Sequence, residues 1–195
     1  MKQKALSICA LSLLLLTACW QKSVYPFYKE KDVIFEPLLL GTWTEPDKKA
    51  EEAATWTFTR GEKESLYRIA IHDGETKLDF DGRLFKLGDK QFLDLYSRQR
   101  SISEMPAHHL VKIRSTGSSF DLQILSLDWT RDWLRAHPSE IAHIYAADPE
   151  HPDDVTKGEI ILTAGTDLLQ KFVHDHLDAT GFFDGQSTFK KVENK

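Results

Sequence analysis

Residues 55–71 read Thr-Trp-Thr-Phe-Thr-Arg-Gly-Glu-Lys-Glu-Ser-Leu-Tyr-Arg-Ile-Ala-Ile, and this stretch decides the fold class. In its first part Trp56 and Phe58 alternate with threonines, and the segment Tyr67–Ile71 alternates in the same way. A period of two, rich in aromatic and β-branched residues, predicts half-buried β-strands. The polar residues between them, which include a glycine, predict a turn, so the two strands form an antiparallel hairpin.

The same pattern continues on both sides of this hairpin. Together with it, five further segments bring the number of predicted strands to seven within about ninety residues, and no helical pattern interrupts them. The further strands are predicted at residues 39–44, 78–84, 92–95, 109–113 and 120–126. Sequential hairpins of this kind form an antiparallel meander, which closes into a barrel because closure removes the exposed edges. The alternation slips at Phe85, which predicts a bulge or a coiled strand.

Two short helices are predicted in the C-terminal half. Asp128 is expected to cap the first, and Thr166 the second, which has an apolar stripe between residues 168 and 177. On the first helix Trp129 and Trp133 fall on one face. That spacing favours packing between the helix and the barrel, and the alternative is an exposed surface for a partner.

The remaining C-terminal segments are predicted to be strands. Ile141–Ala146 and Glu159–Thr163 form a strand pair joined by the acidic loop Asp148–Asp154. Ser187–Val192 is predicted to be a final edge strand.

The first residues predict an export signal. Lys2 and Lys4 precede an apolar run, Ala5–Leu16, which is too short for a membrane-spanning helix of about 20 residues. Residues 1–18 are therefore interpreted as a signal peptide that is removed from the mature protein.

The end of this segment, Leu16-Thr17-Ala18-Cys19, resembles the lipobox of bacterial lipoproteins. The resemblance implies that the peptide is cut before Cys19 and that this cysteine carries a diacylglycerol. It predicts a lipoprotein anchored to a membrane of the bacterial cell envelope, because two or three acyl chains anchor a protein stably where one does not. Trp20 follows the cysteine and leaves the choice of inner or outer membrane open.

Processing changes the composition of the mature chain. Cys9 leaves with the signal and the lipid occupies Cys19, so the mature domain has no thiol for a disulfide or a metal. Removal of two lysines lowers the basic residues from 25 to 23 against 30 acidic ones, a formal charge of −7. An acidic protein without a basic patch is not expected to bind nucleic acid, and the lipid rather than electrostatics holds it at the membrane.

Residues 19–36 are interpreted as a lipid-anchored tether and residues 37–195 as the barrel domain with its helices. The tether contains aromatic residues between Tyr25 and Tyr28. These side chains pack as a strap against the domain, or they lie at the lipid headgroups.

The start of the first predicted strand, Leu40-Gly41-Thr42-Trp43, resembles the Gly-x-Trp start of lipocalin-type barrels. The resemblance implies that Trp43 plugs the closed end of the barrel and that an Arg or Lys of a late strand lies across it, with Arg114 as the candidate. The alternative is an ordinary core tryptophan.

Short segments between Leu38 and about Phe183 also resemble a group of uncharacterised bacterial lipoproteins, which supports the fold and the location and implies no activity. These segments are Gly41–Trp43, Phe85–Asp89, Phe92–Leu95, His109–Lys112, Leu127–Trp129, Ile141–His143 and Leu162–Ala164.

Eight histidines in an acidic chain invite a metal hypothesis, but their spacing argues against it. His108 and His109 are adjacent on a predicted strand and point to opposite faces. His174 and His176 lie about 200° apart around a helix, since each residue turns it by roughly 100°. No metal site is therefore predicted.

The paired carboxylates of the sequence do not indicate a catalytic acid–base pair either. Asp79 and Asp81 share the solvent face of a strand, and the acidic loop that holds Asp153 and Asp154 lacks the ligand pattern of a calcium loop. No nucleophile elbow, phosphate-binding loop or dinucleotide fingerprint occurs. We therefore expect no enzyme activity and no cofactor.

Two non-catalytic functions follow from this pattern. In the first, the barrel interior binds a lipid-like small molecule, because an eight-stranded barrel has room for one small ligand or is filled by its own side chains. The residues expected to line it are Trp56, Phe58, Tyr67, Ile69, Phe80 and Leu122. In the alternative, the barrel is packed and its surface binds an envelope protein whose identity the sequence leaves open.

Overall fold

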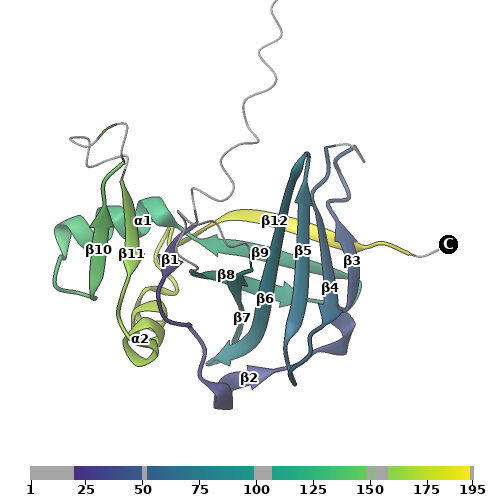
Figure 1. Ribbon diagram of the computed structural model, residues 1–195, viewed down its shortest axis with the longest axis horizontal. Helices are drawn as coiled ribbons and strands as arrows, with labels where there is room; N and C mark the ends of the chain where they lie inside the picture. Colours follow the sequence, from purple (N-terminus) through teal and green to yellow (C-terminus); the bar gives the residue numbers. More distant parts are fainter. Residues whose placement is uncertain (1–19, 50–51, 99–106, 149–150, 152–157, 194–195) are drawn as a thin grey trace, which may run out of the picture.

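The computed structural model describes residues 20–49, 52–98, 107–148, 151 and 158–193 (Figure 1). The fold is mainly β: eight antiparallel strands close into a barrel, and two helices lie in the C-terminal half, which confirms the predicted fold class. The barrel strands are β3 (Gly41–Thr44), β4 (Thr55–Arg60), β5 (Tyr67–Asp73), β6 (Thr76–Leu87), β7 (Lys90–Ser97), β8 (His108–Ser115), β9 (Ser119–Leu125) and β12 (Phe183–Lys191).

The other elements flank the barrel. The segment before it holds β1 (Lys22–Ser23), β2 (Val33–Ile34) and the 3₁₀ turns η1 (Glu30–Asp32) and η2 (Pro37–Leu39). A unit beside the barrel, called the appended unit below, consists of α1 (Leu127–Ala136), β10 (His143–Ala146), β11 (Glu159–Leu162) and α2 (Thr166–His176). The predicted pairing of β10 with β11 is confirmed and is antiparallel.

The last strand closes the barrel. The meander runs from β3 to β9, and β12 pairs with β3 on one side and with β9 on the other. The prediction that Ser187–Val192 forms an edge strand is therefore wrong. A seven-strand meander leaves one open edge on its first strand and one on its last, and β12 satisfies the hydrogen bonds of both.

No bulge interrupts β6. Its register with β7 runs without a shift from Phe80 opposite Ser97 to Leu87 opposite Lys90, so the predicted bulge is wrong. Phe85 points out of the barrel, yet it is 1% exposed because the strap described below and the appended unit cover this part of the outer face. The alternation slips because β6 is buried on both faces over this stretch.

Two hydrophobic cores result. The inner core lies inside the barrel and includes all six side chains predicted to line its interior. The outer core lies between the barrel and the appended unit, where Phe85, Phe92 and Leu125 of the barrel meet Leu169 and Phe172 of α2.

Residues 20–36, called the strap below, run across the outer face of the barrel into η2 (Figure 1). β1 pairs in parallel with β11 and in antiparallel fashion with β8, so the strap joins the appended unit to the barrel. Phe27 is buried in the outer core, whereas Tyr25 is 49% exposed. Phe27 therefore packs against the domain, as the first of the two interpretations of these aromatic residues predicts.

Both helices begin differently from the prediction. Ser126 is the N-cap of α1, and its side chain accepts the Trp129 N–H at 3.3 Å, so Asp128 lies in the first turn instead. Gly165 precedes α2, and the Thr166 hydroxyl donates to the Pro26 carbonyl at 2.8 Å in the strap rather than capping the helix. The cap of α1 is thus two residues earlier than predicted, and α2 begins without a side-chain cap because Thr166 bonds to the strap.

Trp129 and Trp133 stack on each other with ring centroids 5.2 Å apart and are half-buried. Trp129 packs edge-on against Phe182 at 4.8 Å and also contacts Phe172 of α2. Core packing is thus confirmed, although the partners belong mainly to the outer core. Within the described part of the chain, no helix combines the length and apolar character needed to cross a bilayer.

Candidate ligand-binding pocket

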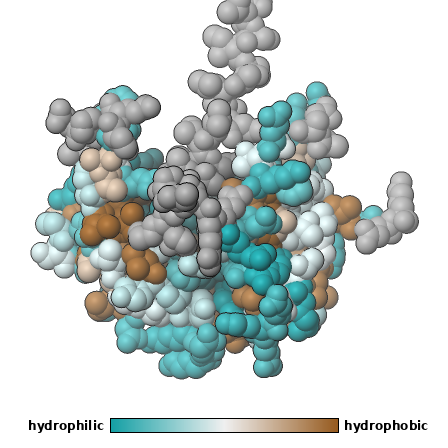
Figure 2. Space-filling view, viewed as in Figure 1, coloured by the Kyte–Doolittle hydropathy of each residue, from teal (hydrophilic) through white to brown (hydrophobic). Residues whose placement is uncertain are grey.

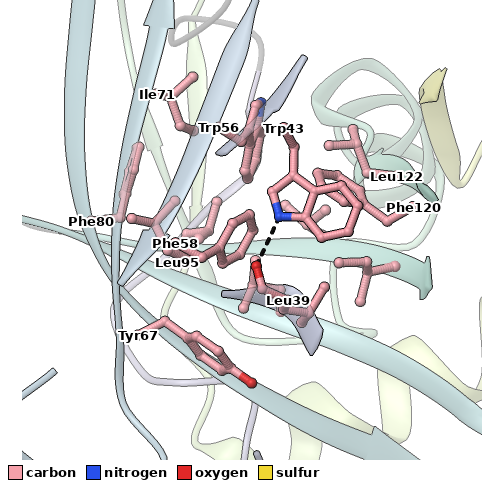
Figure 3. Close-up of a cluster of buried hydrophobic side chains, with 14 of the residues drawn as sticks. Leu39, Trp43, Trp56, Phe58, Tyr67, Ile71, Phe80, Leu95, Phe120 and Leu122 are labelled. Atoms are coloured by element: carbon pink, nitrogen blue, oxygen red, sulfur yellow. Dashed lines mark hydrogen bonds between the residues drawn. The ribbon is translucent and has the colours of Figure 1, made fainter. Parts of the chain in front are cut away.

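One end of the barrel is closed by η2 and Trp43. Trp43 is fully buried and donates its indole N–H to the Leu39 carbonyl at 2.8 Å (Figure 3). The Lys191 ammonium lies 5.2 Å from the centroid of the Trp43 ring and 3.1 Å from the Leu38 carbonyl oxygen. The predicted plug with a cation across it is therefore present.

Lys191, and not Arg114, supplies that cation. Arg114 lies on the barrel's outer surface, where its exposed guanidinium binds the Asp121 carboxylate at 2.6 Å. The prediction of Arg114 is wrong because β12, which carries Lys191, lies directly beside β3 in the closed barrel.

Tyr67 completes this closed end. Its hydroxyl donates to the Glu36 carbonyl at 3.2 Å and accepts the Glu36 N–H at 2.7 Å, while its ring stacks on Phe35 at 4.7 Å. Burial raises the pKa of Tyr67 to about 12, so the phenol stays protonated and keeps donating to the strap.

The middle of the barrel is filled by its own side chains. Phe58, Ile69 and Phe80 are each at most 3% exposed, and Phe58 packs edge-on against Tyr67 and Phe120. Of the six residues predicted to line a ligand site, these three and Tyr67 form packed core. The filled middle confines any ligand to the opposite end of the barrel.

That opposite end, called the open end below, holds a pocket of about 460 Å³, within the range of small-molecule sites. Trp56 and Leu122 are the two predicted lining residues that face it. Its other apolar walls are Trp20, Ala54, Ile71, Leu78, Ile124 and Phe189. Ile71 and Leu78 continue the predicted alternation, whereas Phe189 was missed because β12 was not expected in the barrel.

The rim of the pocket carries more negative than positive charge. Lys48 forms an ion pair with Glu45 at 2.8 Å, and the Asp73 carboxylate is 7% exposed beside them. Burial raises the pKa of Asp73, and the nearby Lys48 ammonium opposes that shift only in part. A ligand that brings its own carboxylate would face two acids and one lysine that is already paired.

Trp20 forms part of the pocket wall and is held on several sides. Its main chain bridges to Ser126, and its ring stacks on Phe80 at 6.0 Å and meets His109 edge-on at 5.6 Å. Sequence reasoning missed this role because Trp20 falls in the predicted tether, outside every predicted strand and helix. Trp20 is thus a fixed part of the barrel's inner core.

His109 supports Trp20 from the side of β8. Its Nδ1 lies 3.2 Å from the Gln21 carbonyl oxygen, which can only accept, so Nδ1 carries the hydrogen. Burial lowers the pKa of His109 to about 4, and the imidazole is neutral at pH 7.

Asp94 and His108 form the most conspicuous polar pair that sequence reasoning missed. Asp94 is 1% exposed; its two oxygens lie 2.6 Å from Nδ1 of His108 and 2.8 Å from the Phe27 N–H, which donates to it. The carboxylate therefore ties the strap to β7 and β8. The only signal was an Asp inside the apolar run of residues 92–95.

The other predicted polar residues do not form a site. His108 and His109 point to opposite faces of β8, as expected. Asp79 is exposed, and Asp81 pairs with Arg68. Among the described residues, no group of three or more His, Cys, Asp or Glu side chains is arranged to hold a metal ion.

Some predicted features lie outside the described residues. These are the signal peptide, Cys19, Asp153 and Asp154.

A second hollow of about 550 Å³ is lined mainly by charged and polar side chains. Lys90 pairs there with Asp89 and Arg114 with Asp121, and Lys86 and Lys112 add further positive charge. Although this hollow is larger, the pocket at the open end is the better ligand site because its walls are apolar and belong to the barrel core.

Comparison with known proteins returns no match to a family model, to a curated protein or to a solved structure. The eight-stranded barrel is consistent with a lipocalin-like fold on its architecture alone. Any function must therefore be argued from the pocket itself.

Proposed function

We propose that the protein is a non-catalytic lipoprotein of the bacterial cell envelope, anchored through a diacylglycerol on Cys19, and that its barrel binds one small apolar ligand. The observation that carries the binding role is the apolar pocket at the open end, with Trp56, Ile71 and Phe189 in its walls. The anchor is supported by the lipobox-like residues 16–19.

The size of the pocket favours a single hydrocarbon chain. A water molecule takes about 30 Å³ in the liquid, and a methylene group is of similar size. A pocket of about 460 Å³ therefore has room for roughly fifteen such groups. The filled middle of the barrel leaves no path for a longer ligand to extend toward Trp43.

The rim favours a ligand without negative charge. Glu45 and Asp73 line the pocket, and Lys48 is paired with Glu45. An ester, an amide or an alcohol avoids the repulsion that a free fatty acid would meet there.

The chain from Trp20 to Lys195 is suited to the test because it holds every described element. We expect it to bind an uncharged apolar fluorophore such as N-phenylnaphthylamine, with a saturable rise in fluorescence. Leu78→Trp, which fills the pocket, should abolish that rise. Thr59→Trp adds the same side chain at an exposed position of β4 and should leave it unchanged.

An interaction role is the second candidate, and specific exposed side chains favour it. Ile144, Leu168 and Tyr25 are each about half exposed, and Figure 2 shows apolar surface gathered over the appended unit. Absence of probe binding by the wild-type chain, together with a bare mass in native mass spectrometry, would favour this surface over the pocket.

A further inference from the structure

The residue that follows Cys19 lies at the pocket. Trp20 lines it, and its main chain is fixed by the bridge to Ser126. Consecutive Cα atoms lie about 3.8 Å apart, so Cys19 is attached directly to a residue of the pocket wall. A group bonded to Cys19 is therefore separated from a residue of the pocket wall by a single peptide bond.

We propose that the ligand of this pocket is one acyl chain of the lipid on Cys19 of the same molecule. The inference rests on the proposed lipid anchor and on the proposed apolar site, and it names the occupant that those two features share. The protein would thus hold part of its own anchor inside its barrel.

Proximity favours this occupant over free lipids. A group tethered through a short linker reaches an effective concentration in the millimolar range or above, which a free lipid in water does not approach. Trp20 cannot drift away from the open end, because Phe80 and His109 pack against its ring. The residue that follows the attachment point is therefore held in the pocket wall.

The chemistry of the rim fits the same occupant. Acyl chains on a lipoprotein cysteine are joined by ester or amide bonds and bring no carboxylate to Glu45 and Asp73. The capacity of roughly fifteen methylene groups corresponds to one chain and not to two or three. The remaining chains stay available for the membrane.

Occupancy of the pocket would regulate anchoring. One acyl chain alone gives marginal, reversible membrane binding, and two give stable binding. A molecule that withdraws one of its chains therefore binds more weakly than one that inserts all of them. Filling the pocket with protein side chains should strengthen membrane attachment.

Photo-crosslinking tests the proposal on the full chain expressed in a bacterium that acylates it. Cells are fed a fatty acid with a diazirine near its methyl end, and the lipidated protein is purified and irradiated. We expect crosslinks within the same chain to peptides that hold Trp56, Ile71 or Phe189.

Matched variants show whether the crosslinks depend on the pocket. Leu78→Trp and, as a second filling variant, Ile124→Phe should reduce the crosslinks at least tenfold, and Thr59→Trp should keep them. Crosslinks that fall only on membrane lipids, or that persist in both filling variants, would overturn the proposal. Both variants are first checked for wild-type circular dichroism.

The fluorophore experiment separates this inference from the proposed function. If the unlipidated chain binds the probe but the lipidated protein gives no pocket crosslinks, the apolar site stands and occupancy by the protein's own lipid is overturned. If the unlipidated chain does not bind the probe, the proposed ligand-binding function is overturned, and so is the inference that the protein's own acyl chain occupies the pocket. A mature mass without acyl groups on Cys19 removes the anchor and also overturns the inference.

Discussion

Acidification should destabilise the fold through one buried imidazole, that of His109. Its ring is 7% exposed, lies edge-on to Trp20 and donates from Nδ1 to the Gln21 carbonyl. Burial lowers its pKa to about 4 in the folded state, against about 6.5 in the unfolded chain.

The sign follows from which state binds the proton. Above about pH 6.5 the imidazole is neutral in both states and contributes no pH dependence. As the pH falls from about 6.5 to about 4, the unfolded chain takes up a proton that folded His109 excludes, so the free energy of unfolding decreases. One pH unit corresponds to about 1.36 kcal/mol, so the loss reaches roughly 3 kcal/mol at about pH 4 and then levels off.

Urea unfolding of the chain from Trp20 to Lys195 at several pH values measures this loss. Carboxylates titrate over part of the same range, so the wild type is compared with His109→Gln, which cannot titrate there. The free energy of unfolding of the wild type minus that of the variant should fall by roughly 3 kcal/mol between about pH 7 and pH 4. A difference that stays constant with pH would refute the assignment of a neutral, buried His109.

Three further substitutions test the contacts that close the barrel, tie the strap to it and begin α1. Trp43→Ala removes the fully buried plug and should lower the free energy of unfolding in urea by about 3–5 kcal/mol; a loss below about 1 kcal/mol would contradict its role. Asp94→Ala leaves the Phe27 N–H and the His108 imidazole without their acceptor and should lower the free energy of unfolding by about 2–4 kcal/mol. It should also speed tryptic cleavage of the strap at Lys29. An unchanged cleavage rate would contradict the claim that Asp94 holds the strap against the barrel. Ser126→Ala removes the N-cap of α1 and should lower the midpoint of thermal unfolding by the equivalent of about 1 kcal/mol. An unchanged midpoint would show that the cap does not stabilise the fold.

The sequence by itself determined the features that depend on neighbouring residues. Alternation in Trp56, Phe58 and Ile69 predicts strands because side chains of successive residues point to opposite faces, and the turns between strands are encoded locally. The seven-strand meander and the membership of all six predicted lining residues in the inner core follow from such short-range patterns. The plug role of Trp43 was predicted from its Gly-x-Trp context.

Only the tertiary structure decided the features that depend on residues distant in the chain. β12 closes the barrel across more than a hundred residues of sequence from β3, and it brings Lys191 to Trp43 and Phe189 to the pocket. Phe85 breaks the alternation of β6 because the outer core covers the strand from outside. The outer face of a strand looks the same in sequence whether water or another element lies over it, and the edge of a meander does not specify which later segment will fill it.

The division of the barrel interior into a filled part and a pocket is also a tertiary result. Four of the six predicted lining residues, among them Phe58 and Tyr67, pack against one another, and two face the open end. Alternation assigns a side chain to the inside of a barrel, but the space left beside it depends on how side chains from all eight strands, and Trp20 of the strap, pack together.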